Sequence, residues 1–232
     1  MPAISTDPAV ALALWIQLQD SAFPAGRMVH SHGLEEWLSQ HPDAEPDEVA
    51  AVTLDYLSAG VAPLDATITA AAWVVAPDHH WLRELDELAA SYKLFDNART
   101  ASESSGRQLA AAAGTIGLAA ESAYLQAVRA GITEGHSAVV DGALQAALGI
   151  PQHTAVLGSL RSMLASLLSA AVRLGRLGPL QSQRLQAGAA ADLVDMAEQA
   201  CRRDLDDLWS TAPALEISGM RHETRTGRLF AT

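Results

Sequence analysis

Apolar residues recur at helical spacing along most of the chain, and turn residues separate the segments. The first segment runs from Pro8 to Gln19, where Asp7 can cap the helix and proline is tolerated in the first turn. The clearest amphipathic pattern covers residues 78–95, with an apolar face opposite a charged one. In the N-terminal half, further helices are expected from Gly33 to the turn at 41–46, from Asp47 to a break at Gly60–Pro63, and from that break to about Ala76. Another helix is expected to begin at Thr100, because Glu103 stands at capping-box spacing from it. The remaining helices are expected over 119–130, 135–148, 151–173 and 179–209, and the last of these is open to an interruption.

The composition favours the same structural class. Aromatic residues make up only 5% of the 232 residues, while alanine and leucine are abundant, which disfavours β-sheet and favours helix. An apolar content of 49% suffices for one sizeable core, and no shift in composition marks a second domain. We therefore predict an all-α, compact bundle of roughly ten helices that forms a single domain over 1–216. Residues 217–232 are locally basic and end in an apolar pair, which predicts an extended C-terminal tail.

The formal net charge of -12 limits the classes of partner. Nucleic acid and anionic membranes would both repel the chain at long range, so neither is expected as a partner, and basic partners fit better. The single cysteine, Cys201, excludes an intramolecular disulfide framework and suits a reducing compartment. The sequence lacks an export signal, and charges interrupt its apolar runs short of about 18 residues. A cytoplasmic protein is expected.

Polar residues are concentrated around a predicted turn in the run 17–36. Pro24 presets φ for a turn, and Gly26 admits backbone conformations that are closed to other residues. Such a fixed path would present one group of side chains together, namely Asp20, Ser21, His30, Ser31 and Glu35. We favour contact with a partner as the role of this group.

Two other roles of the run stay open. His30, His32 and Glu35 could supply nitrogen and oxygen ligands to nickel or zinc, as a metal-binding protein or a metal-dependent enzyme requires. The imidazoles and Ser31 could instead satisfy buried backbone groups around the turn. The sequence contains no phosphate-binding loop, no nucleophile elbow and no His-Glu-x-x-His motif. It therefore predicts no catalytic residue and no stably bound cofactor.

Four separated segments resemble, in the same order, those of the urease accessory protein UreF family. They are the run from Asp20 to Glu35, the stretch 96–109 that ends in Gly-Arg-Gln-Leu, the stretch 170–178, and Met220-Arg221-His222-Glu223 followed by Arg228-Leu229-Phe230. Together they span nearly the whole chain. One departure is Arg27, which stands where the family usually has a second glycine.

The resemblance implies an all-helical, dimeric adaptor that is not itself an enzyme. The implied partners are UreD (UreH in some organisms), the GTPase UreG and apo-urease, with nickel carried by the assembled complex. Partner contacts are then expected in the turn and the tail, at Asp20, Ser21, Pro24, Gly26, His30, Ser31, Glu35, Arg221, His222, Glu223, Arg228, Leu229 and Phe230. The tail arginines would form charged hydrogen bonds, and Phe230 would fill a pocket of UreD.

Overall fold

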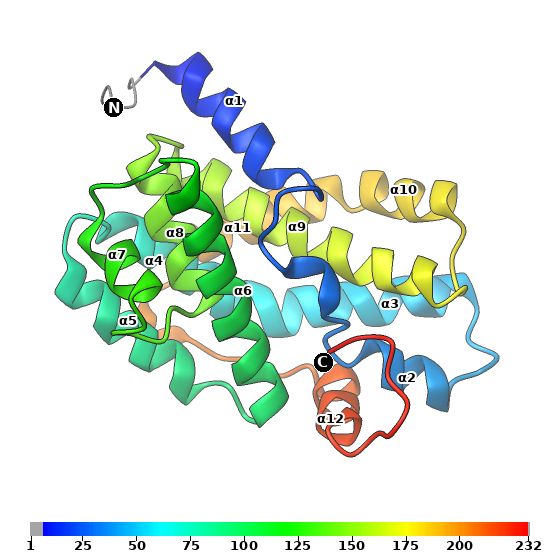
Figure 1. Cartoon of the computed structure of the whole chain (residues 1–232). Coiled ribbons are helices and arrows are strands. Elements are labelled where there is room, and N and C mark those ends of the chain that lie inside the picture. The colour runs from blue at the N-terminus through cyan, green and yellow to red at the C-terminus, as the bar shows by residue number, and fades with distance from the viewer. Residues whose placement is uncertain (1–6, 232) are drawn as a thin grey trace.

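The computed structural model describes residues 7–231, which form helices joined by turns, without a strand in this part of the chain (Figure 1). The all-α prediction is confirmed. The elements are α1 (Pro8–Gln19), η1 (Arg27–Val29), α2 (Leu34–Gln40), α3 (Pro46–Asp55), η2 (Tyr56–Ala66), α4 (Thr67–Val74), α5 (His79–Ser91), α6 (Asp96–Thr115), α7 (Ala123–Arg129), α8 (Ser137–Ala147), α9 (Gln152–Arg173), α10 (Pro179–Gly188), α11 (Ala190–Arg202), η3 (Leu205–Asp207) and α12 (Pro213–His222).

Helix α9 is the centre of the packing and contacts α3, α4, α8, α10 and α11. It contributes to two apolar clusters. Ala155 faces the cluster that α4, α5 and α8 build, whereas Val156, Leu160 and Leu164 face the cluster that α3 and α11 build. The two clusters adjoin along α4 and α9, so these helices lie in the interior of the bundle (Figure 1).

The break expected at Gly60–Pro63 is not formed. The chain stays helical from α3 through η2 to α4, and η2 has π-helical geometry with Pro63 inside it. A proline inside an α-helix clashes with the carbonyl four residues earlier, and the wider π turn relieves this contact. Thr67 Oγ1 donates a hydrogen bond to the Ala62 carbonyl at 3.2 Å, so a side chain satisfies a backbone group next to the proline.

Two other boundaries were tested by the structure. Helix α6 begins at Asp96, so Thr100 and Glu103 lie inside the helix and the predicted capping box is wrong. Glu103 instead pairs with Arg107 one turn later, at 3.2 Å. The interruption in 179–209 is confirmed and falls at Ala189, between α10 and α11.

The C-terminal segment is not the extended tail that its composition predicts. Residues 217–222 belong to α12, so the boundary expected after residue 216 falls inside this helix. Helix α12 packs against α2, and the chain then folds back toward the turn that precedes α2 (Figure 1). The Ala231 amide donates to the Val29 carbonyl at 2.9 Å, which joins the end of the described chain to η1.

Two helical stretches are long and apolar enough to cross a membrane by length and composition alone, Pro46–Val74 and Gln152–Arg173. In their most apolar windows, 67% and 56% of the residues are buried inside the fold. Core helices of soluble proteins pass the same length test, and this burial matches a role in the core. That the chain has no membrane partner stays a prediction.

Candidate functional site

The polar turn between α1 and α2 follows a path fixed by glycines. Gly26 has a φ of 72° and begins η1, as the turn prediction required. Gly33 has a φ of 85° at the start of α2, and a Cβ at this position would clash with the Leu215 carbonyl oxygen of α12. The turn thus places the first residues of α2 directly against the C-terminal helix.

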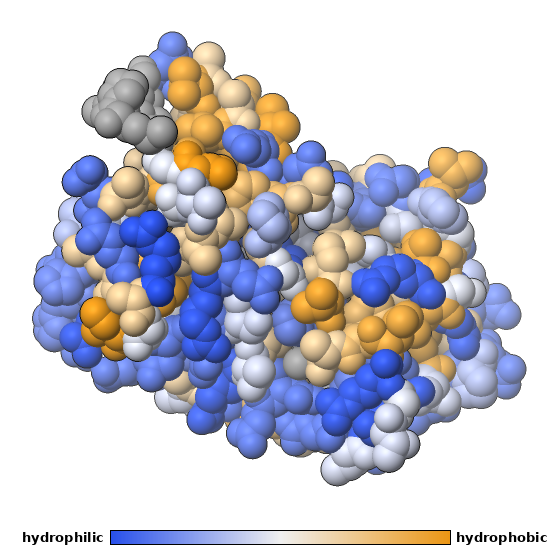
Figure 2. All heavy atoms as spheres, viewed as in Figure 1, coloured by the Kyte–Doolittle hydropathy of each residue, from blue (hydrophilic) through white to orange (hydrophobic). Residues whose placement is uncertain are grey.

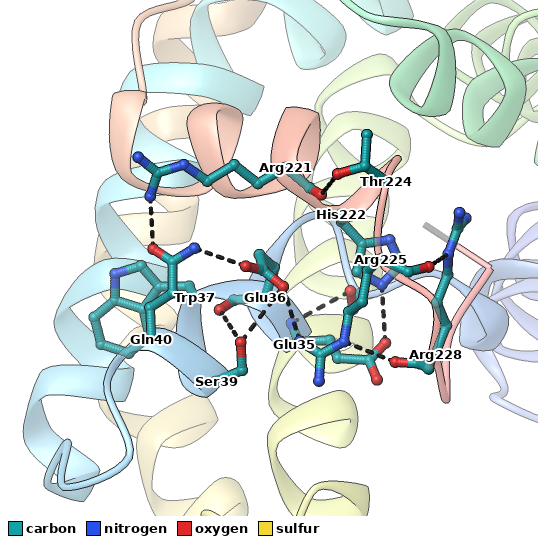
Figure 3. Close-up of polar contacts among 12 residues, drawn as sticks. Glu35, Glu36, Trp37, Ser39, Gln40, Arg221, His222, Thr224, Arg225 and Arg228 are labelled. Carbon is teal, nitrogen blue, oxygen red and sulfur yellow. Dashed lines mark hydrogen bonds and ion pairs between the residues drawn. The ribbon is translucent and has the colours of Figure 1, made fainter.

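Glu35, in the first turn of α2, holds the C-terminal segment (Figure 3). Its side chain is 5% exposed, and its carboxylate accepts hydrogen bonds from the Leu229 amide at 2.8 Å and the Phe230 amide at 3.1 Å. His222 Nε2 lies 3.0 Å from Glu35 Oε2. The other ring nitrogen of His222, Nδ1, has no hydrogen-bond partner among the described residues.

These hydrogen bonds determine the charge of Glu35. Burial alone would raise the pKa of Glu35, but the bonds from the Leu229 amide, His222 and the Phe230 amide outweigh burial and lower the pKa. The carboxylate is therefore ionised at neutral pH and makes charge-assisted hydrogen bonds, each worth about 1.5–3 kcal/mol. Glu35 is a charged anchor for a segment almost two hundred residues away in the chain.

A second row of contacts runs along the outside of α2 (Figure 3). Arg225 Nη1 donates to Glu36 Oε2 at 2.8 Å, and Arg221 Nη1 donates to Gln40 Oε1 at 2.7 Å. Gln40 Nε2 in turn donates to Glu36 Oε1 at 2.6 Å. Burial alone would raise the pKa of Glu36, but the bonds from Gln40 and Arg225 outweigh burial and lower the pKa.

The end of the segment is buried in its own chain. Phe230 is 3% exposed and belongs to the apolar cluster around α3 and α9. The Arg173 guanidinium lies 4.3 Å from the centre of the Phe230 ring, and Arg173 Nη1 donates to the Met28 carbonyl at 2.6 Å. In the structure the chain itself supplies the pocket of Phe230, so the expected filling of a partner's pocket stays a prediction and would require this segment to detach first.

The structure brings together only some of the predicted site residues. Glu35, His222, Leu229 and Phe230 form the anchor just described. Four turn residues line a separate surface hollow beside α9, namely Asp20, Ser21, Pro24 and Gly26. Partner binding by either group stays a prediction.

The remaining predicted residues have local partners. Ser31 Oγ accepts from the Glu35 amide at 3.4 Å, and Glu223 Oε1 accepts from the Asn97 amide at 2.8 Å. Arg228 donates through Nε to the Arg225 carbonyl and through Nη2 to the Glu223 carbonyl, at 2.9 and 2.7 Å. These bonds fix the shape of the last loop.

The histidines of the turn do not form a metal centre with Glu35. The rings of His30 and His32 are 6.1 Å apart, and the Glu35 oxygens are used by the C-terminal segment. Between residues 7 and 231, no three His, Cys, Asp or Glu side chains converge as metal ligands would. Burial lowers the pKa of His30, and burial, His30 and Lys93 lower the pKa of His32 to about 3. The metal-binding alternative gains no support from this geometry.

His32 instead lies where two internal hollows meet. The hollows, of about 50 and 100 Å³, share His32, Tyr56, Asp65 and Lys93. Lys93 Nζ and Asp65 Oδ1 are 2.6 Å apart, and both side chains are largely buried. One water takes up about 30 Å³ of liquid, so these spaces suit a few ordered waters. This cluster was not predicted from the sequence, although Lys93, the only lysine of the chain, was a signal.

Arg27, the departure from the family pattern, reaches inward. Its Nη2 lies 3.2 Å from Asp141 Oδ1 on α8, and its Nη1 donates to the Leu18 carbonyl at 3.2 Å. Asp141 is buried, so Arg27 compensates a charge that would be costly alone. The turn is thereby tied to α1 and α8 as well as to α2.

The fold and the site define an all-helical protein in which an N-terminal turn and the C-terminal segment close onto one buried carboxylate. The sequence model of the UreF family matches residues 44–190. Similar relatives are the urease accessory proteins UreF of Granulibacter bethesdensis (33% identical, covering 99% of this chain and 97% of the relative), Trichodesmium erythraeum (28%, covering 98% and 99%) and Paenarthrobacter aurescens (33%, covering 92% and 95%). The chain belongs to the UreF family of urease accessory proteins, which supports a role in urease maturation.

Proposed function

We propose that the chain acts as a non-catalytic adaptor in urease maturation. It bridges UreD (UreH in some organisms) and the GTPase UreG while nickel is inserted into apo-urease in a GTP-dependent step. The assembled complex handles nickel, and this chain holds no cofactor stably. The proposed location of the chain is the cytoplasm. The observation that carries the adaptor proposal is the closure of the C-terminal segment onto Glu35, because it joins two segments of the family resemblance into one surface.

The outer side of this surface supports a docking role. Leu229 is 55% exposed although its amide is anchored, and Val29 next to the chain end is also exposed. A backbone held in place beneath exposed side chains is preorganised, so a partner need not order the segment on binding. We propose that UreD meets this face.

Control of UreG follows from linkage. If the chain binds one nucleotide state of UreG more tightly than the other, it must shift the equilibrium between these states by the difference in affinity. The test is to measure UreG binding with a GTP analogue and with GDP. Equal affinities would remove GTPase control from the proposal and leave the bridging role intact.

A second copy of the chain is the proposed partner of α1. This helix contains no charged residue from Pro8 to Gln19, and Leu12 and Ile16 are 53% and 59% exposed. A helix that is apolar on every side is usually covered. In a chain with a net charge of -12, such a neutral face lets two copies meet with little repulsion.

The adaptor role is tested by light-scattering chromatography with the cognate UreD. The intact chain is compared with a chain that ends at His222, which keeps α12 but lacks the residues anchored by Glu35. A complex with the intact chain alone is expected, with the thermal unfolding midpoint as the check on folding. Equal complexes would move the UreD contact to the bundle, and no complex with either chain would contradict the adaptor proposal.

A further inference from the structure

The C-terminal segment carries three arginines in a chain where acidic residues outnumber basic ones by 27 to 15. Arg221, Arg225 and Arg228 follow one another along the outside of this segment, with Arg221 and Arg228 at opposite ends of the cluster in Figure 3. We call these three residues the arginine rim. The overall charge predicts basic partners, so the local charge of this face requires its own explanation.

The acidic side chains beside the rim are occupied within the chain. Glu35 accepts from two amides and contacts His222, and Glu36 accepts from Arg225 and Gln40. Glu223 accepts from the Asn97 amide. Each of these carboxylates therefore uses at least one oxygen to hold the segment in place.

The guanidinium groups of Arg221 and Arg228 have N–H donors that make no hydrogen bond to the described residues. A guanidinium has five N–H donors and no acceptor. Toward the described residues, Arg221 donates through Nη1 alone and Arg228 through Nε and Nη2, while both residues are exposed. The hydrogen-bonding capacity that the rim offers to an outside molecule is thus mainly that of a donor with positive charge.

We propose that the arginine rim binds an acidic polypeptide segment of the protein that docks on this face. The proposal rests on the adaptor function and specifies the chemistry of one partner surface. Guanidinium groups pair with carboxylates in a bidentate geometry that lysine cannot match. This docking mode leaves Phe230 buried in its own chain.

A polypeptide fits this face better than a nucleic acid does. The rim is short, and the exposed apolar side chain of Leu229 lies within it, which suits a protein surface. A long polyanion would extend over the rest of a chain whose net charge is -12 and would be repelled there. A protein segment needs only a few carboxylates placed opposite the rim.

The test measures binding of a short fluorescein-labelled poly-glutamate peptide to the full chain by fluorescence anisotropy at low ionic strength. The variant Arg221→Glu reverses one rim charge at a residue whose side chain, among the described residues, makes a single hydrogen bond, to Gln40. Its matched control is Arg184→Glu on α10, an exposed arginine away from the rim, which changes the net charge equally. Amide exchange at Leu229 and Phe230 shows that the segment stays docked in both variants.

We expect the peptide to bind the wild type, Arg221→Glu to weaken binding at least tenfold, and Arg184→Glu to change it less than twofold. Added salt should weaken wild-type binding. No binding to the wild type, or equal weakening in both variants, would overturn the proposal. A labelled poly-uridine that binds as tightly, with the same loss in Arg221→Glu, would also overturn the assignment to a polypeptide. None of these results depends on UreD, so the adaptor function is judged separately.

Discussion

Two buried carboxylates in this fold use the same hydrogen-bonding chemistry to hold different kinds of segment. Asp86 on α5 accepts from Thr133 Oγ1, the Gly135 amide and the His136 amide at 3.0, 2.7 and 2.7 Å. Glu35 on α2 also binds three groups, but they belong to the C-terminal segment. The first carboxylate closes an internal loop between α7 and α8, and the second holds a chain end.

The difference lies in what happens when each contact is lost. The loop at Asp86 is fixed on both sides by core helices, so its buried amides cannot reach water without disturbing the bundle. The segment at Glu35 is fixed only by α12, and a chain end can detach while the remainder stays folded. We therefore expect one anchor to contribute to global stability and the other mainly to fix the position of the chain end.

The largest effect is expected at Asp86. Asp86→Asn places an amide group against backbone donors and leaves one of them unsatisfied, so the free energy of unfolding should fall by about 3 kcal/mol. Urea denaturation followed by circular dichroism measures this loss. A decrease below about 1 kcal/mol would show that the loop reaches water easily and would remove the contrast with Glu35.

Glu35→Gln should have a smaller global effect and a larger local one. We expect a loss of about 1 kcal/mol in the free energy of unfolding, together with loss of exchange protection at the Leu229 and Phe230 amides. Hydrogen exchange measured by NMR gives both values. Glu36→Gln is the matched control, since it removes the charge of the neighbouring, partly exposed pair with Arg225 and leaves the Glu35 carboxylate in place. A global loss as large as that of Asp86→Asn would contradict an independently docked segment.

The pH dependence of docking should follow Glu35. The pKa of Glu35 is lowered from 4.5 in the folded chain, so its contribution is complete above this value and is lost as the pH falls through the folded pKa. Exchange protection of the Phe230 amide, corrected for intrinsic rates, should therefore fall as the pH drops below 4.5. In Glu35→Gln this dependence should be absent, and an unchanged pH profile in the variant would assign the effect to another group.

The smallest effect is expected at Arg173. Arg173→Met keeps the aliphatic stem over Phe230 but removes the cation and its bond to the Met28 carbonyl. Because Arg173 is exposed, the docked segment should lose about 0.5 kcal/mol, seen as a modest rise in the exchange rate of the Phe230 amide. A loss equal to that of Glu35→Gln would make Arg173 a second anchor.

The helices could be predicted from the sequence where local signals decide them. Asp7 accepts from the Ala9 amide at the start of α1, and Gly26 adopts the positive φ that the turn required. Pro63 misled the prediction, because burial and the π turn keep the helix continuous. Local rules give the cost of a proline, but they do not include the packing that offsets it.

The site could be predicted only as a set of residues. Glu35 and His222 both belonged to the expected group, yet 187 positions separate them, and no periodicity links such distant residues. The burial of Phe230 depends on the same tertiary contact. The pair of Arg27 and Asp141 was missed for this reason too, since each residue alone gives no sign of its partner.

We expect Glu35 to matter for the proposed partner docking and Asp86 for stability. The most direct test measures the affinity for the cognate UreD of the wild type, Glu35→Gln and Asp86→Asn, at a temperature where all three are folded. We predict that Glu35→Gln loses at least tenfold in affinity while Asp86→Asn, although less stable, binds like the wild type. Wild-type affinity in Glu35→Gln, or an equal loss in both variants, would contradict this claim.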